Sequence, residues 1–482
     1  MEELLVWKPW QRVILGLALA GSSAVLFTLA FPPYGLWPFI FFGLVPMIVA
    51  QHRVMPQRLG SVAYAVGIGG FFAGYFGAMF AQAPWFMQAL PLFIALIAGL
   101  GSLRERAFHR RTGYRWLLLH GPAVWVGIEM IRGLIPQIGT WGFAAYALFE
   151  QVWFIQPVSV FSIYGLSVLI LSVNYALGLG ALTLFDGRWR LETATIPVKR
   201  ELALKGVLAV GIVVVTWGVL SAALLHQPPA DLRVAAIQPA MAVRTDEGVE
   251  ELARLTQQAA DAGAQLVVWH EGALPFDPQV TLTEELQALA RETHVHLVIG
   301  YVVEAPAGFR NESVLLTPEG EFLGPFGKDH PVAWSGETSV TRGPFQAYPT
   351  DLGPIGMMIC YDLDFTDTAR RLTRAGARLI AVPSLDWPAI AAKHYTHLVF
   401  RAVENRVAAV KADIAFDSAI IGPYGRILQR SVTPEGRREI LVADVALGTG
   451  TAPSVQLGDW VGWLSLAAMA AFSIADVILG RD

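Results

Sequence analysis

The sequence predicts a multi-pass α-helical membrane domain with eight spans, joined to an α/β domain that lies outside the membrane. Composition gives the first reason: 54% of the 482 residues are hydrophobic and 15% are charged, whereas soluble domains carry roughly 25% charged residues. The second reason is that the apolar residues are unevenly distributed along the chain. Long apolar runs fill 12–225 and 460–480, whereas 231–447 has the mixed composition of a water-soluble domain. The length also exceeds that of one ordinary core, which indicates more than one structural unit.

Eight segments are long and apolar enough to be membrane spans. A hydrocarbon core about 30 Å thick requires roughly 20 helical residues to cross it. The first segment follows Lys8 and includes Arg12, as in a signal peptide, but further spans follow at once and no convincing small-residue cleavage site is present, so we expect it to be retained. The segments are 12–31, 35–50, 60–80, 84–103, 116–132, 154–185, 202–225 and 460–480.

The orientation follows from the Lys and Arg residues of the loops, which concentrate on the cytoplasmic side. Three loops carry them and therefore share one side with the N-terminus, whereas the loops 31–35, 81–84 and 133–153 carry none. Seven spans then place the mixed segment outside, and the eighth returns the C-terminus to the cytoplasm. The basic residues are Arg53, Arg58, Arg104, Arg106, Arg110, Arg111, Arg115, Arg188, Arg190, Lys199 and Arg200.

The expected division is a seven-span domain over 1–225, an extracytoplasmic α/β domain over 226–459 and a closing span over 460–482. The net charge of −4 and the absence of a dense basic tract argue against a nucleic-acid partner. Cys360 is the one cysteine, which excludes an intramolecular disulfide and a multi-cysteine metal site.

The outer segment alternates strand and helix patterns, which is typical of an α/β domain with buried sheets. We expect functional groups just past the carboxyl ends of strands, and Glu271, Cys360 and Asp386 occupy such positions. The expected strands are 232–240, 264–275, 296–305, 353–362 and 377–387, and the expected helices are 247–263, 284–295 and 391–409.

Cys360 has two interpretations. A cysteine after GMMI is often a small core residue. However, this one stands at a strand end before the polar and aromatic YDLDF, and a free thiol is unusual in an oxidising compartment. A nucleophilic thiol requires a nearby base or cation.

Other candidates are ambiguous when taken singly. Glu271 could be a helix cap or turn residue, and Lys328 could be an exposed loop lysine. His394 and His397 are three residues apart on one helix, but no further ligand has a fitting spacing, so structural histidines are favoured over a metal pair. Arg401, Glu404 and Arg406 are expected to form ion pairs along that helix; all these positions are read from the sequence alone.

The order of Glu, Lys and Cys resembles the carbon–nitrogen hydrolase, or nitrilase, superfamily. The residues that carry the resemblance are WHEGALP (269–275), GKDHP (327–331) and MICYDLDF (358–365), with IQP (237–239) and RAVENR (401–406) where that superfamily has its first strand and a structural helix. A domain of this kind between seven spans and one closing span resembles the bacterial apolipoprotein N-acyltransferase family. Segments 31–46, 163–174 and 450–460, and the stretch from Glu129 to Gly133, also resemble motifs of that family.

The resemblance implies an α-β-β-α sandwich and roles for particular residues. Cys360 would be the nucleophile, Glu271 the general base, and Lys328 the cation that stabilises the oxyanion together with the backbone N–H after the nucleophile. Glu337, Tyr361 and Asp362 would be supporting residues, and His394 would be architectural. These positions are read from the sequence.

The sequence also departs from the family at several places. WSGE (334–337) replaces the usual PFGE, Asp362 stands where Glu is usual, KADIAFDSAIIGPYG (411–425) retains only its end, and MAVRTD (241–246) lacks a usual Trp. The last two differences lie where substrate recognition is expected, so they bear on the substrate more than on the chemistry.

The implied function is transfer of an acyl chain from a phospholipid, through a thioester on Cys360, to the N-terminal amine of a diacylglyceryl-cysteine lipoprotein. We expect a monomer in the bacterial inner membrane, with no cofactor, no metal site and no nucleic-acid partner. A membrane-anchored amidase or nitrilase, or an acyltransferase with another amine acceptor, is the alternative, and a catalytically silent lipid-binding protein is a further one.

Overall fold

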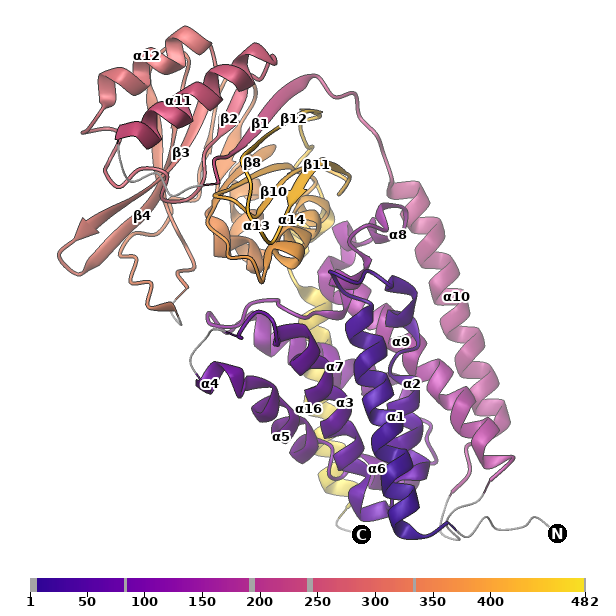
Figure 1. The fold of residues 1–482 in the computed structure, drawn as a ribbon. Helices are drawn as coiled ribbons and strands as arrows, with labels where there is room; N and C mark the ends of the chain where they lie inside the picture. The colour runs from indigo at the N-terminus through magenta and orange to yellow at the C-terminus, as the bar shows by residue number, and fades with distance from the viewer. Residues whose placement is uncertain (1–6, 82–84, 190–195, 241–245, 333–334, 481–482) are drawn as a thin grey trace.

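The helices and the sheets occupy opposite ends of an elongated molecule (Figure 1). The structure is a computed structural model that describes residues 7–81, 85–189, 196–240, 246–332 and 335–480. A bundle of long helices forms one end; α1 begins and α16 ends at the end of this bundle that is far from the sheets (Figure 1). The chain leaves the bundle after α10, builds both sheets, and returns through α16.

The bundle is formed before residue 225 and is completed by the C-terminal helix. Its long helices are largely apolar, as membrane-spanning helices must be. The helices are α1 (Pro9–Leu29), η1 (Trp37–Phe41), α2 (Val45–Val49), η2 (Ala50–Val54), η3 (Gln57–Leu59), α3 (Gly60–Phe76), α4 (Trp85–Gln88), α5 (Leu90–Gly101), α6 (Glu105–Arg111), α7 (Leu117–Gly133), η4 (Ala144–Leu148), α8 (Val152–Ile155), α9 (Val158–Asp186), α10 (Arg200–Leu224), α15 (Pro453–Leu457) and α16 (Trp460–Leu479).

Six of the eight expected spans are helices long and apolar enough to cross a membrane. They are Pro9–Leu29, Trp37–Val54, Gln57–Phe76, Val158–Asp186, Arg200–Leu224 and Trp460–Leu479.

In the described part of the chain, the other two expected spans form helices shorter than the roughly 20 residues that cross a membrane. Segment 84–103, whose first residue lies outside the described residues, forms α4 and the 12-residue α5. Pro91 stands in the first turn of α5, where a missing N–H is tolerated, so it begins a helix rather than continuing one. Segment 116–132 forms α7, which has 17 residues and includes Pro122. The count of eight spans therefore stays a prediction.

The three basic loops gather at the end of the bundle where α1 begins and α16 ends. Arg53 forms an ion pair with Asp186 at the end of α9, with Nε 2.5 Å from Oδ1. Arg104 binds Asp476 near the end of α16, with Nε 2.7 Å from Oδ2. The guanidinium of Arg12 on α1 donates to the Val54 carbonyl at 2.9 Å. These described basic residues of the loops therefore lie at the end of the bundle opposite the sheets.

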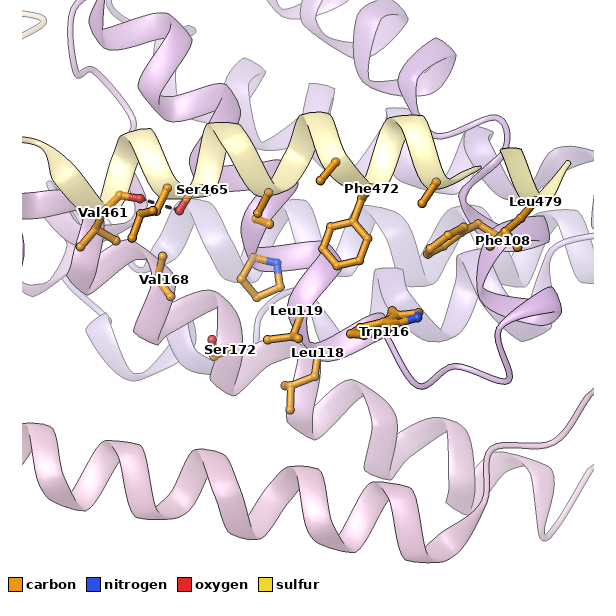
Figure 2. Close-up of a pocket in the computed structure, with 16 residues that line it drawn as sticks. Phe108, Trp116, Leu118, Leu119, Val168, Ser172, Val461, Ser465, Phe472 and Leu479 are labelled. Carbon is orange, nitrogen blue, oxygen red and sulfur yellow. Dashed lines mark hydrogen bonds between the residues drawn. The ribbon is translucent and has the colours of Figure 1, made fainter. Parts of the chain in front are cut away.

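An apolar groove of about 620 Å³ runs along the outside of the bundle between α7, α9 and α16. Phe108, Trp116 and Phe472 project into one end of it, and Val168, Val461 and Ser465 lie at the other (Figure 2). An apolar surface of this kind suits contact with lipid chains rather than water.

The chain between α10 and α15 forms two six-stranded sheets. One has the order β12-β1-β2-β3-β4-β5 and the other β11-β10-β9-β8-β7-β6. Both are mixed, because β1, β2 and β3 are parallel, as are β7, β8 and β9, while their outer neighbours are antiparallel. The strands are β1 (Leu232–Gln238), β2 (Leu266–Val268), β3 (His296–Ala305), β4 (Gly308–Leu316), β5 (Phe322–Gly327), β6 (Ala347–Tyr348), β7 (Ile355–Met357), β8 (Leu379–Ser384), β9 (Ala408–Asp413), β10 (Asp417–Ile421), β11 (Ile427–Val432) and β12 (Glu439–Val445).

The sheets face each other through contacts of β1 and β2 with β9 and of β3 with β8, and helices cover their outer faces. α11 (Asp246–Asp261) and α12 (Thr283–Thr293) cover the first sheet, and α13 (Thr366–Arg374) and α14 (Ala391–Asn405) cover the second. The apolar side of α11 and α12 packs on a core that includes Ile237, Leu255, Trp269 and Leu286, all of them buried. This layering is the expected α-β-β-α sandwich.

Helix α14 is buried on every side because it packs on its own sheet and on α9 of the bundle. Glu404 accepts a hydrogen bond from the Ile163 N–H at 2.8 Å, next to Ser162, where α9 is kinked by a φ of +53°. The expected ion pair of Arg401 with Glu404 is present at 3.0 Å. Arg406 does not extend it but donates to Gln156 in the bundle at 2.5 Å.

Candidate active site

Four turns at the edges of the two sheets bring together the catalytic residues expected from the sequence. Glu271 follows β2, Cys360 follows β7 and Asp386 follows β8, as strand-end positions predict. Lys328 follows β5 directly, and its backbone N–H donates to the Asn311 carbonyl of β4 at 2.9 Å. Lys328 is only 2% exposed, so it is not the exposed loop lysine that was its alternative interpretation.

The Lys328 ammonium lies between two carboxylates. Its Nζ donates to Glu271 Oε1 at 2.7 Å and to Glu337 Oε2 at 3.0 Å. Asn311 completes the arrangement by donating Nδ2 to Glu271 Oε1 at 2.6 Å and to Glu337 Oε1 at 2.9 Å. The backbone N–H of Val332 donates to Glu337 at 2.7 Å. Glu337 therefore holds the lysine and the asparagine against Glu271, and sequence reasoning did not identify Asn311.

Cys360 begins a short 3₁₀ helix, η6 (Cys360–Asp364), with a φ of +44°. A residue with a side chain is strained in this left-handed region, and such strain is concentrated at functional sites. The thiol Sγ lies 3.6 Å from Asp386 Oδ1.

Asp362 connects the nucleophile turn to the lysine loop. Its Oδ2 accepts the Ile359 N–H at 2.9 Å, and its Oδ1 accepts the His330 N–H at 2.7 Å. A carboxylate with two backbone donors is firmly placed, because each such bond is charge-assisted. Tyr361 is buried beside it, with its ring edge-on to Phe365 at 5.3 Å between centroids.

Burial and charge set the protonation of these groups. Burial and the neighbouring Glu271 raise the pKa of the Cys360 thiol well above its ordinary value, although Lys328 opposes the change. Burial likewise raises the pKa of Glu271, and the charge of Glu337 adds to this while Lys328 opposes it. Burial would lower the pKa of Lys328, but Glu271, Cys360 and Glu337 raise it well above the usual range. The resting site therefore holds a protonated lysine and a neutral thiol, and attack requires a base.

A cavity of about 810 Å³ contains this site and extends to the bundle. The catalytic end is lined by Glu271, Lys328, Glu337, Cys360 and Tyr361. The other end is lined by residues from the end of α3, the turn after it and the start of α5, namely Phe76, Ala78, Met79, Phe80, Ala81 and Leu90. The wall of the cavity thus changes from polar at the thiol to apolar at the bundle.

A buried polar network lies behind the thiol, and the sequence did not predict it. Asp386 accepts hydrogen bonds from Lys411 at 2.8 Å and from Ser384 at 3.0 Å, and it binds His394 Nδ1 at 2.7 Å. Burial would lower the pKa of His394, but Asp386 and Asp364 raise it to about 10, so this imidazole is a buried cation. The sequence did contain one indication of this network, namely Asp386 at a strand end followed by a histidine on the next helix.

The bundle contacts this network directly through residues 140 and 141. Trp141 Nε1 donates to Asp364 Oδ2 at 2.9 Å, and Thr140 Oγ1 donates to the Asp364 carbonyl at 2.7 Å. The Trp141 ring also stacks on His394 and lines the cavity. Glu129 supports this loop by accepting the Ala144 N–H at 2.9 Å.

Comparisons with known proteins cover both parts of the chain. Residues 23–176 match the family model "Apolipoprotein N-acyltransferase N-terminal domain", and residues 233–452 match "Carbon-nitrogen hydrolase". The apolipoprotein N-acyltransferase of Geobacter metallireducens is 28% identical over 94% of this chain and 93% of its own length. That of Gloeobacter violaceus is 27% identical over 98% and 95%. A solved structure of the amidase from Nesterenkonia sp. AN1 covers 45% of this chain and 94% of its own, with 20% identity and a TM-score of 0.39.

Proposed function

The chain belongs to the apolipoprotein N-acyltransferase family, and from this premise we propose that it moves an acyl chain from a phospholipid to the N-terminal amine of a diacylglyceryl-cysteine lipoprotein through a thioester on Cys360. The observation that carries the proposal is the shared cavity. It places a thiol, a carboxylate and an ammonium at one end and the apolar ends of α3 and α5 at the other. A lipid ester entering from the bundle side would keep its acyl chain at the apolar end and bring its carbonyl carbon to the thiol.

In the first half-reaction the thiol becomes a nucleophile as it attacks. Glu271, whose pKa is raised by burial, accepts the Cys360 proton while sulfur bonds to the ester carbonyl carbon. The carbonyl oxygen becomes an oxyanion, which the Lys328 ammonium and backbone N–H donors stabilise. The ester C–O bond then breaks, and the proton on Glu271 passes to the departing oxygen of the lysophospholipid.

In the second half-reaction the thioester is transferred to an amine. The lipoprotein α-amine attacks the thioester carbonyl and gives a proton to Glu271. The same donors hold the second oxyanion, the C–S bond breaks, and the proton returns to Cys360. Transfer exceeds hydrolysis because both substrates are lipids and the apolar end of the cavity keeps water scarce.

The proposed location is the bacterial inner membrane with both termini in the cytoplasm. The gathering of Arg53, Arg104 and their neighbours at the end of the bundle opposite the sheets supports this orientation. The sheets and the thiol would then lie outside the cytoplasm, where lipoproteins receive their final acyl chain. Within this proposal the protein functions as a monomer with an eight-span bundle.

The test is intact-protein mass spectrometry of the purified full-length protein supplied with phospholipid of one defined acyl chain. We expect a mass increase equal to that acyl group, located on Cys360 and removed by an amine-bearing diacylglyceryl peptide. The Cys360→Ala variant is the control and is expected to carry no adduct.

Complementation separates the proposal from the amidase alternative. The wild-type gene should support growth of a bacterium depleted of its own N-acyltransferase, and Cys360→Ala should not. Release of ammonia from small amides without any lipid adduct would contradict the acyl-transfer proposal and favour the hydrolase.

A further inference from the structure

A second cluster of chemically reactive side chains lies at the end of the bundle opposite the thiol. Glu105 and His109 share one face of α6, and His120 comes from α7. His109 Nε2 is 3.3 Å from His120 Nδ1, and Glu105 Oε1 is 3.9 Å from each of these nitrogens. We propose that these three side chains bind one divalent transition-metal ion of the Zn²⁺ class.

The size of the triangle formed by these atoms supports the proposal. In their common plane, the point equidistant from the three atoms lies about 2.2 Å from each, given the three separations. Zinc binds histidine nitrogen at about 2.0–2.1 Å and carboxylate oxygen at about 2.0–2.2 Å. An ion therefore fits among these ligands with movements of a few tenths of an ångström. Two histidines with one carboxylate form a common zinc ligand set.

The surroundings hold the ligands as outer contacts of metal sites usually do. Glu105 Oε2 accepts a hydrogen bond from the Gln51 amide at 2.8 Å, which leaves Oε1 directed at the histidines. His52 stands edge-on to His109 at 5.6 Å between ring centroids. Both ring nitrogens of His52 and Nδ1 of His109 are buried and have no hydrogen-bond partner among the described residues. His52 thus supplies an additional imidazole next to the three ligands.

Two other clusters also combine histidine with carboxylate or thiol side chains. In each of them a Lys or Arg side chain already supplies the positive charge that a metal ion would bring. Asp386, beside Cys360 and His394, is paired with Lys411 at 2.8 Å. Asp329 and Asp367, beside His330, are paired with Arg371 at 3.2 and 3.6 Å. In the cluster on α6, the nearby guanidinium of Arg53 is neutralised by Asp186, and Arg106 donates to the Met55 carbonyl.

The consequence would be structural. An ion bound by α6 and α7 would fix the turn between them, close to His52 of η2 and to Phe472 of α16, whose ring lies 5.2 Å from that of His120. The site would stabilise the cytoplasmic end of the bundle without taking part in acyl transfer.

The test uses the full-length protein in detergent, treated with a chelator and then titrated with Co²⁺. We expect one equivalent of Co²⁺ to bind with visible d–d absorption, Zn²⁺ to displace it, and Zn²⁺ to raise the Tm. Glu105→Gln and His120→Ala should each lose the absorption and the Tm shift while eluting as the wild type does in gel filtration.

Matched variants of the other two clusters are the controls. His330→Ala and Cys360→Ala should both bind Co²⁺ as the wild type does, and the latter lacks the thiol needed for acyl transfer. Absence of Co²⁺ binding by the wild type, or binding that survives both Glu105→Gln and His120→Ala, would overturn the proposal. Loss of binding in His330→Ala or Cys360→Ala would also overturn it, because the ion would then occupy another cluster.

Discussion

At the scale of single residues, the site depends on charges that are buried in pairs. Lys328 is balanced by Glu271 and Glu337, and His394 is balanced by Asp386 and Asp364. A buried charge without its partner is strongly destabilising. The raised pKa of the thiol and that of Glu271 are consequences of the same burial, so the resting enzyme is protected against adventitious reaction of its one thiol.

His394 and His397 allow a direct test of this charge pairing. Asp386 and Asp364 overcome burial and raise the pKa of His394 to about 10, whereas burial lowers that of His397 to about 4. A histidine whose pKa is raised on folding stabilises the folded state fully at pH values below its unfolded pKa, near 6.5. This stabilisation is lost as the pH rises toward the folded-state pKa of about 10. We expect His394→Gln to lower the Tm at pH 6.5 by an amount equivalent to a few kcal/mol, and the gap to the wild type to narrow toward pH 10.

His397→Gln is the matched control on the same helix. Its wild-type imidazole is neutral when folded, so its effect on stability is present above pH 6.5 and is lost as pH falls toward 4. The Tm difference for this variant should be flat between pH 6.5 and 10. A flat difference for His394→Gln across the same range would mean that its imidazole is not a buried cation.

At the scale of secondary-structure elements, β3 sets the position of Glu271, the proposed general base. Gly300 lies in β3 where the chain around Glu271 crosses it. A Cβ added there would be 2.4 Å from the His270 carbonyl oxygen and 2.9 Å from the Glu271 Cα. Contacts this short with backbone atoms force the turn to move, because a packed interior cannot absorb an added methyl group.

Gly300→Ala should therefore impair both catalysis and folding. We expect formation of the Cys360 acyl adduct to slow by about tenfold to a hundredfold, since misplacing a catalytic group by about 1 Å has effects of this order. The cost in unfolding free energy should be about 1–3 kcal/mol. Gly422→Ala is the control, because its Cβ would meet the Arg426 carbonyl oxygen at an ordinary 3.7 Å. Equal adduct rates in Gly300→Ala and the wild type would refute this role of β3.

The sequence predicted the elements that carry a local pattern. Strands β1, β3 and β8 and helices α11 and α12 lie within about two residues of their expected bounds at most ends, because apolar runs and turn residues delimit them. The placement of Glu271, Cys360 and Asp386 at strand ends was also predictable and is confirmed. The positive φ of Cys360 had no such signal, and strands β4 to β6 and β9 to β12 were not predicted either; β12 forms by pairing with β1, about 200 residues earlier in the chain.

At the scale of the whole molecule, the contacts between the two parts could not be predicted from sequence. Trp141 and Asp364 are 223 positions apart, and Glu404 and Ile163 are 241 apart. Of the aromatic residues in the loop 133–153, Phe143, Tyr146 and Phe149 are interior, Trp153 is 55% exposed, and Trp141 lines the cavity. The departure at MAVRTD cannot be placed, because 241–245 lie outside the described residues.

The proposed orientation in the membrane can be measured with single introduced cysteines. Cys360→Ala supplies a background without any cysteine. Val280, which is 79% exposed on the sheet side, and Gln57, which is exposed at the end with the basic loops, are suitable positions. In intact inner-membrane spheroplasts, Val280→Cys should react with a membrane-impermeant maleimide and Gln57→Cys should react only after lysis. The reverse pattern would invert the orientation.

The burial of α14 between its sheet and the bundle also bears on how the molecule can be divided. An excised fragment of residues 226–459 would leave the α9-facing side of α14 in water. Glu404 would lose its hydrogen bond from Ile163, and Arg406 would lose its hydrogen bond to Gln156. It would also remove Trp141 and Thr140 from Asp364, next to the His394 cation. The part of the chain between α10 and α15 is therefore not an autonomous domain. Heat or denaturant should unfold it together with the neighbouring helices in one cooperative transition.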